Sequence, residues 1–215
     1  MHPLLPVLLA ATEGSFPPVD GGVTMFPPHR RALESIVSFT GHAYVSSRLG
    51  LEEISDLAPD GYGAVLNPEI QLRMAGPGGA VGVVDVTMFA RGQGGGSLAP
   101  REDLEDHPRV RYARSIRDEV TVYGSVEGLV TIGLGLADRV EMSIEISVSG
   151  IRGRDLIREA LGLVTEGEPL FAAVSPGNSR SLRAFLSCGF VPIGSEVVIR
   201  TTSGGPVEPL LTARE

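Results

Sequence analysis

The stretch "MSIEISVSGIRGRDLIREAL", residues 142–161, decides the fold, because it passes from a strand pattern to a helix pattern through one short loop. Polar and apolar residues alternate over 142–148, which predicts a strand. Glycines at 150 and 153 mark the loop, and the residues after it predict a helix over about 153–164. The first N–H groups of a helix lack partners, so this junction is suited to an anion such as a pyrophosphate. An ordinary helix start without a ligand is the alternative.

Outward from this stretch, the last third of the chain alternates between strand and helix patterns. Strands are expected near 139–148, 170–174 and 190–200, with helices near 153–164 and 178–188. This βαβαβ order predicts a parallel or mixed sheet with helices packed on it. The strands expected near 119–124 and 128–135 form a hairpin ahead of it. The fold class is therefore α/β (α+β), with a mixed central sheet flanked by helices.

The first half of the chain carries weaker patterns. Residues 1–29 contain "FPPVDGG" and "FPPHR" and are interpreted as an extended arm that packs on the core. A helix from about 31 to 41, followed by a strand, then a short helix in "LEEISDLAP" and a strand over 80–90, come next. We expect one domain over residues 30–202 and a C-terminal tail over 203–215.

Composition excludes several classes of function. All 18 basic residues are arginine, so no mechanism based on lysine is available. The net charge of −8 and the pI near 5.1 argue against a nucleic-acid surface, which needs a basic face. One cysteine, Cys188, excludes an intramolecular disulfide and a cysteine cluster for a metal. The opening "MHPLLPVLLAA" is too short for a membrane span, and we expect a cytoplasmic protein without membrane partners.

Residues 139–200 resemble the GNAT superfamily of acetyl-CoA-dependent N-acetyltransferases. The coenzyme loop of that family follows the pattern Arg/Gln-x-x-Gly-x-Gly/Ala, and Arg152 matches its first position. A later family segment has Asn, then about seven residues, a Tyr and Gly-Phe, which Asn178, Gly189 and Phe190 match in spacing. The resemblance implies two splayed parallel strands whose free main-chain groups bind the pantetheine arm of acetyl-CoA, the cosubstrate.

Family resemblance also assigns coenzyme-binding residues. Main-chain groups of residues 146 and 148 would bind the arm, the loop and helix start would bind the pyrophosphate, and residue 178 would bind the arm or the loop beyond it. Asn178 is equally interpreted as the N-cap of its helix. The full set is Ile146, Val148, Arg152, Gly153, Arg154, Asp155, Leu156, Ile157 and Asn178.

Three positions depart from the family pattern. Asp155 and Ile157 stand where the family has Gly and a small residue, and Phe185 stands where it has a proton-donating Tyr. Asp155 either repels a phosphate or only stabilises the positive end of its own helix. Phe185 either replaces the general acid or is a core residue of an amphipathic helix.

The acceptor amine needs a general base, and two carboxylates are candidates. Glu141 and Glu145 lie on one face of the strand that leads to the loop. They are catalytic if that face lines the cleft and ordinary strand carboxylates if it faces solvent. The four histidines lack the spacing of metal ligands, so no metal is expected.

The preferred hypothesis is an acetyl-CoA-dependent N-acetyltransferase that transfers directly to an unknown amine, either a small molecule or a peptide. The alternative is a non-catalytic module of the same fold, a ligand sensor or interaction domain that has lost acetyl transfer. The apolar hairpin over 119–136 is interpreted either as a homodimer contact or as an internal sheet edge.

Overall fold

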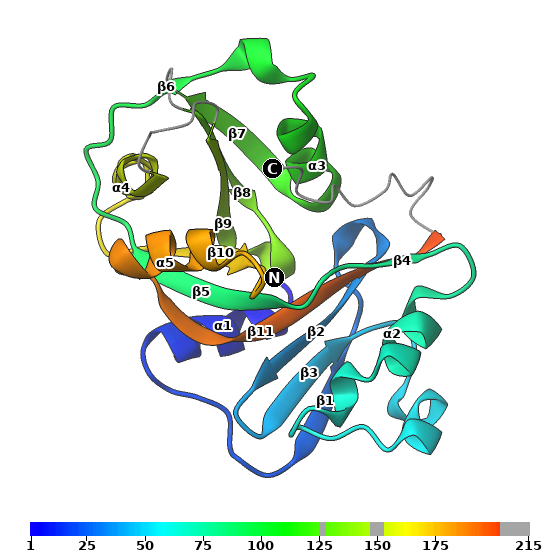
Figure 1. Ribbon diagram of the computed structural model, residues 1–215. Helices are drawn as coiled ribbons and strands as arrows, with labels where there is room; N and C mark the ends of the chain where they lie inside the picture. The colour runs from blue at the N-terminus through cyan, green and yellow to red at the C-terminus, as the bar shows by residue number, and fades with distance from the viewer. Residues whose placement is uncertain (125–127, 147–152, 203–215) are drawn as a thin grey trace. The chain divides into compact units, whose positions relative to one another are not determined.

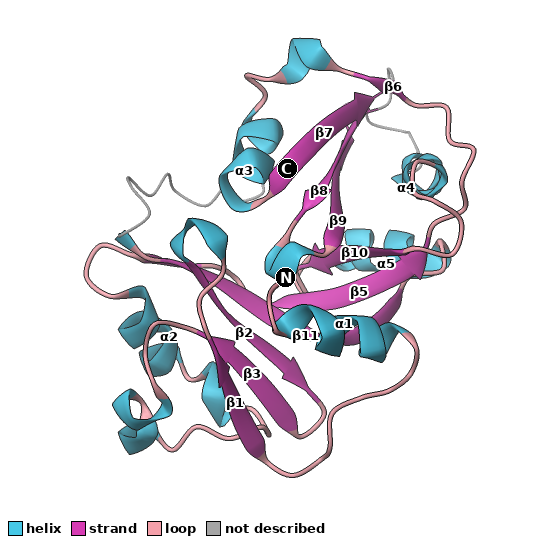
Figure 2. Ribbon diagram, turned by 180° about the vertical axis from the view of Figure 1, so that it is seen from behind, coloured by secondary structure: helices cyan, strands magenta, loops and turns pink. Residues whose placement is uncertain are grey.

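The computed structural model describes residues 1–124, 128–146 and 153–202. Within these residues the chain forms two compact units (Figure 1, Figure 2). The first unit contains residues 1–86 and 193–202, and the second unit lies within residues 87–192. The single domain expected over 30–202 stays a prediction. Among the described residues no helix has the length and apolar character needed to cross a bilayer.

The first unit is a mixed sheet with helices on it. Its strands are β1 (Gly22–Phe26), β2 (Leu33–Phe39), β3 (His42–Ser46), β4 (Ala80–Val81) and most of β11 (Val191–Arg200). They lie in the order β1, β3, β2, β11, with β4 beside β11. β1 and β3 are parallel, whereas the other neighbours are antiparallel. The helices are α1 (Leu4–Thr12) and α2 (Pro68–Ala75).

One core of the first unit joins the sheet to α2. Ile36, Val45 and Val197 from three neighbouring strands are fully buried and pack in one cluster with Ile70 and Met74 of α2. Alternation puts side chains of every second strand residue on this face, which is why the strand positions in the cluster have the same parity within each strand. α2 is capped by Asn67, whose side chain accepts the N–H of Glu69.

The second unit holds the segment that decides the fold. Its strands are β5 (Asp85–Arg91, from residue 87), β6 (Ala99–Pro100), β7 (Asp118–Gly124), β8 (Gly128–Leu134), β9 (Val140–Ile146) and β10 (Pro169–Val174), in the order β5, β10, β9, β8, β7, β6. Its helices are α3 (Pro108–Ile116), α4 (Gly153–Gly162) and α5 (Ser179–Ser187). β9 and β10 are parallel, and β6 to β9 are antiparallel neighbours. The mixed α/β fold is confirmed.

The prediction of an extended arm over residues 1–29 is wrong, since this segment contains α1 and β1. Leu4, Leu8 and Ala11 are buried at helical spacing, and Pro6 falls in the first turn, where it removes no helical hydrogen bond. β1 pairs with β3 over its whole length. The prolines and glycines between these elements form turns, but they do not extend to the apolar runs on either side.

Two helix predictions in the first half of the chain are also wrong. Residues 33–39 form β2, in which β-branched Ile36 and Val37 are buried on opposite faces of the sheet. When both faces of a strand are buried, apolar and polar residues no longer alternate along it. The spacing of apolar residues in this segment was therefore mistaken for that of a helix. Residues 51–57 form two short 3₁₀ turns, Leu51–Glu53 and Ser55–Leu57. The strand expected over 80–90 is interrupted between β4 and β5.

Candidate functional site

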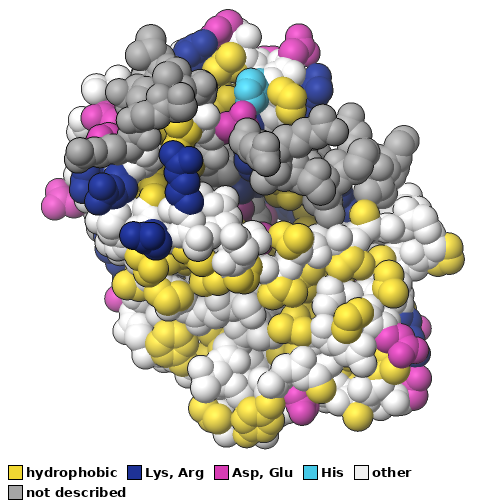
Figure 3. Space-filling model, in the orientation of Figure 1, with side chains coloured by type: hydrophobic (Ala, Val, Ile, Leu, Met, Phe, Trp, Pro, Cys, Tyr) yellow, Lys and Arg dark blue, Asp and Glu magenta, His cyan; other side chains and the backbone are white. Residues whose placement is uncertain are grey.

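A groove with three arginines lies between α4 and α5 of the second unit. Its volume is about 800 Å³, and its walls are the first turn of α4 and one face of α5. The lining residues are Gly153, Arg154, Ser179, Arg180, Arg183, Ala184, Leu186 and Ser187. Basic side chains gather over these two helices in the space-filling view (Figure 3). The groove offers positive charge and hydroxyl groups to a ligand.

The sequence of α5 explains why it turns this face to the groove. Phe185 is 4% exposed and packs edge-on against Phe190, with the ring centroids 4.8 Å apart. Residues three or four apart share a helix face, so Arg180, Arg183 and Ser187 lie together, away from Phe185. The interpretation of Phe185 as a core residue fits this packing. Its phenyl ring has no proton to give to a leaving thiolate.

Asn178 is the N-cap residue of α5. The Oδ1 atom of Asn178 accepts the N–H of Ser181 at 3.0 Å, which satisfies one of the free donors at the helix start. A role for Asn178 in coenzyme binding stays a prediction.

The start of α4 is held close to β9 and to the end of α5. A Cβ atom at Gly153 would lie 2.7 Å from Cδ1 of Ile146, so a larger residue there would displace that side chain. The thiol of Cys188 donates to the main-chain oxygen of Arg154 at 3.4 Å. Burial raises the pKa of the Cys188 thiol, so it remains a protonated donor at neutral pH. These contacts fix the two walls of the groove.

Asp155 is paired with a neighbour on its own helix. Its Oδ1 atom accepts a hydrogen bond from Arg158 at 2.9 Å, and both side chains are about half exposed. Asp155 is not among the residues that line the groove. Among the described residues no carboxylate pairs with Arg154, Arg180 or Arg183. The groove therefore keeps its positive charge.

β9 and β10 are parallel neighbours, and among the described residues they pair at one register position, Phe171 opposite Glu141. Beyond Glu141, β9 continues to Ile146 while pairing with β8 on its other side. Within the described part of the chain, the side of β9 that faces β10 has no strand partner over 142–146. The two strands therefore diverge in the direction of Ile146, which lies against the start of α4.

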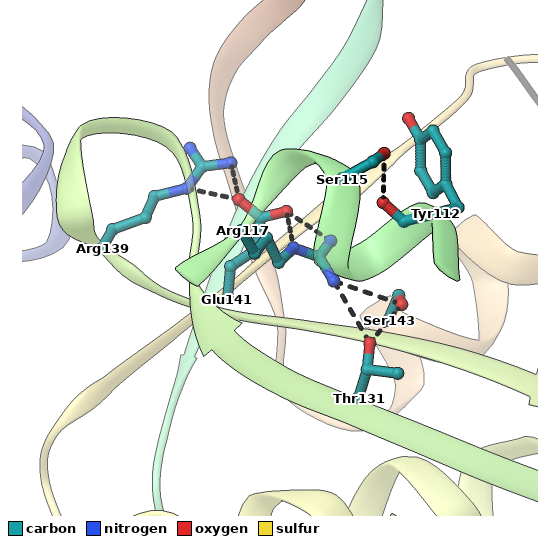
Figure 4. A network of polar contacts seen from close by, with 7 residues as sticks. All are labelled: Tyr112, Ser115, Arg117, Thr131, Arg139, Glu141 and Ser143. Carbon is teal, nitrogen blue, oxygen red and sulfur yellow. Dashed lines mark hydrogen bonds and ion pairs between the residues drawn. The ribbon is translucent and has the colours of Figure 1, made fainter. Parts of the chain in front are cut away.

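Glu141 lies at this meeting point, in a buried network of charges (Figure 4). Its Oε1 accepts from Nε of Arg117 at 2.9 Å, and its Oε2 accepts from Nη2 of Arg139 at 2.7 Å. Arg117 also donates to the hydroxyls of Thr131 and Ser143, at 3.2 and 3.3 Å. Burial by itself would raise the pKa of Glu141, but Arg117 and Arg139 outweigh it and hold the pKa at about 2. A carboxylate so stabilised is a weak base.

Glu145 lies at the open end of β9 and its side chain is 42% exposed. Nε of Arg109 donates to its Oε2 at 3.3 Å, and Nε2 of His107 lies 3.6 Å from its Oε1. His107 also caps α3, because its Nδ1 accepts the N–H of Arg109 at 3.2 Å. In the neutral ring the proton therefore sits on Nε2, toward Glu145.

No element was predicted over residues 101–118, so sequence reasoning missed His107 and Arg109. The pair His107-Pro108, with proline at the first helical position, was the available sign of a helix start.

Other residues named from the sequence fall into two groups. Leu156 and Ile157 are 2% and 0% exposed, so their side chains belong to the core and only their main chain is available to a ligand. Val148 and Arg152 lie outside the described residues. In the described part of the chain, no group of three or more His, Cys, Asp or Glu is arranged to hold a metal ion.

Comparisons with known proteins add little to this geometry. No family model and no curated protein matches the chain. A crystal structure of a putative acetyltransferase from the GNAT family, from Novosphingobium aromaticivorans, is similar at 16% identity and TM-score 0.41, over 57% of this chain and 67% of that one. A functionally unknown conserved protein from Staphylococcus epidermidis is similar at 13% identity and TM-score 0.38, over 57% of this chain and 62% of that one. Because likeness at this level carries no argument, function rests on the residues themselves.

Proposed function

We propose that the protein transfers an acetyl group from acetyl-CoA to an amine by direct attack on the thioester. The observation that carries the proposal is the parallel pair β9 and β10, which meets at Glu141 and opens toward the start of α4. The groove with three arginines supports it, since it lies at that start. The match of residues 139–200 to the motifs of the GNAT superfamily supports the same reaction.

The residues present fit a coenzyme of this chemistry. Arg154, Arg180 and Arg183 supply charged donors for phosphate oxygens, and the start of α4 adds unpaired N–H groups. Ser179 adds a hydroxyl to the same wall, whereas the hydroxyl of Ser187 donates to the main-chain oxygen of Ala184 at 2.8 Å. The free side of β9 over 142–146 supplies main-chain groups for the amides of the pantetheine arm, as a neighbouring strand would.

Acetyl-CoA supplies the activated acyl group, whose C–S bond breaks as the new C–N bond forms. The chain holds both reactants close together, an effect worth about 7–11 kcal/mol of barrier in well-oriented reactions. Glu145 is the better placed of the two candidate bases, because Glu141 is buried and bound to two guanidinium groups. Phe185 leaves the thiolate without a specific acid, at a cost of about 10²- to 10⁴-fold in rate.

A second candidate is a module that binds acetyl-CoA without transferring its acetyl group. Two observations favour it: Phe185 is buried in the core, and Glu145 is already paired with Arg109. Such a module would use the same groove and the same free strand edge. The two candidates differ only in whether the bound coenzyme gives up its acetyl group.

Calorimetry with acetyl-CoA, combined with mass spectrometry of a panel of small and peptide amines, tests both. Micromolar binding with acetylation of one class of amine supports the enzyme. Micromolar binding without any acetylated product supports the second candidate. Undetectable binding at millimolar coenzyme contradicts both.

The variant Asp155→Asn tests whether the acidic residue weakens the groove. We expect the dissociation constant for acetyl-CoA to change by less than about threefold, since Asp155 is bound to Arg158 and lies outside the lining. Isothermal calorimetry at low and at physiological salt checks this. An affinity for acetyl-CoA that rises tenfold or more would show that the Asp155 carboxylate repels the phosphates.

A further inference from the structure

The side chain of Arg139 contacts those of Glu141 and Phe171 where β9 and β10 pair. Arg139 donates through Nε and Nη2 to one oxygen of Glu141, at 3.0 and 2.7 Å, and its guanidinium lies over the ring of Phe171, 5.2 Å from the centroid. Phe171 is the β10 residue that faces Glu141 in the register. Arg139 therefore connects β9 to β10 at the position where Glu141 and Phe171 pair. We call Arg139, Glu141 and Phe171 the clasp.

The clasp is anchored to the rest of the second unit. Arg117, at the end of α3, donates to the other oxygen of Glu141 and to Thr131 on β8 (Figure 4). Arg139 is 1% exposed, Phe171 1% and Glu141 4%. Removing one partner of a buried ion pair is strongly destabilising, although replacing the whole pair by apolar residues of similar volume is often neutral. The network lies at the point where the two strands part.

We propose that the clasp sets the angle between β9 and β10 and thereby positions the strand edge that binds the coenzyme. Arg139 and Phe171 act as positioning residues in this proposal, which rests on the proposed function. Ile146 lies five positions after Glu141, or about 16 Å further along the strand. A rotation of about 5° at Glu141 therefore moves the open end by about 1.4 Å over that length. This displacement carries a main-chain hydrogen bond of about 2.9 Å well beyond the range in which it stabilises binding.

The variant Arg139→Lys tests the clasp, because lysine keeps the charge but loses the planar fork that serves Glu141 and the ring together. A matched control is Arg91→Lys. Arg91 also lies over an aromatic ring, at 5.4 Å from the centroid of Phe89, but it lies on β5 and not at the meeting of β9 and β10. Calorimetry with acetyl-CoA is the measurement, and thermal unfolding shows that each variant is folded at the assay temperature.

We expect Arg139→Lys to weaken acetyl-CoA binding about tenfold, the loss of about one hydrogen bond, and to speed hydrogen exchange at residues 142–146. Arg91→Lys should leave both unchanged. If Arg139→Lys does not fold, Phe171→Leu removes the ring and leaves the ion pairs intact, with the same expected weakening. Equal affinity of the folded variant and the wild type overturns the clasp and leaves the proposed function standing. Wild-type protein that binds no coenzyme overturns the proposed function and the clasp with it.

Discussion

The double variant Arg180→Gln/Arg183→Gln should bind acetyl-CoA about a hundredfold more weakly than the wild type. Each arginine in the groove is free to make a charge-assisted hydrogen bond to a phosphate oxygen, and such a bond contributes about 1.5–3 kcal/mol. Two of them lost amount to at least about 3 kcal/mol, or about a hundredfold in the dissociation constant. Glutamine keeps most of the length and the helix propensity, so α5 should remain folded. Calorimetry at physiological salt measures the effect.

The matched control is Arg158→Gln, one turn after Arg154 on α4. Arg158 is 55% exposed, pairs with Asp155 and does not line the groove. It changes the net charge in the same sense, so it separates a local contact from a general electrostatic effect. Its dissociation constant should stay within about threefold of the wild type. A comparable loss in control and double variant would show that the groove does not bind the phosphates.

The order of strands and helices in residues 139–200 was predictable because the spacing of apolar residues changes sharply there, from every second residue in the strands to every third or fourth in the helices. The helices expected over 153–164 and 178–188 are α4 and α5, with ends shifted by one or two residues. β2 was mistaken for a helix because Ile36 and Val37 are buried on opposite faces, and only the tertiary fold supplies those two faces. The pattern of a strand buried on both sides does not alternate.

The groove was predictable only in part. Arg154 was identified from the helix start, whereas Arg180 and Arg183 were missed, because the sequence does not say which face of α5 meets α4. Glu141 was treated as a candidate base for a similar reason. Its partner Arg117 lies 24 positions away along the chain, and only the folding of α3 onto the sheet brings the two together.

Replacing the buried carboxylate by an amide should produce the largest loss of stability. In Glu141→Gln, Arg117 and Arg139 keep their charges inside the second unit and lose the anion that both contact. Breaking a buried ion pair by removing one partner costs about 3–5 kcal/mol. Denaturant unfolding at pH 7 should show this loss in the free energy of unfolding. Glu145→Gln is the control on the same strand. Because Glu145 is 42% exposed, its loss should be at most about 1 kcal/mol.

The pH dependence of this difference identifies the charge as its cause. The pKa of Glu141 is lowered from 4.5 to about 2 in the folded protein, so its ionised form stabilises the fold. That contribution, about 3 kcal/mol, is fully present above pH 4.5 and is lost as the pH falls toward 2. The gap in unfolding free energy between wild type and Glu141→Gln should therefore be constant from pH 7 to 5 and shrink below pH 4.5. A gap that keeps its size down to pH 2.5 would assign the loss to the shape of the side chain, because protonation of Glu141 in the unfolded chain must already reduce the contribution of its charge at that pH.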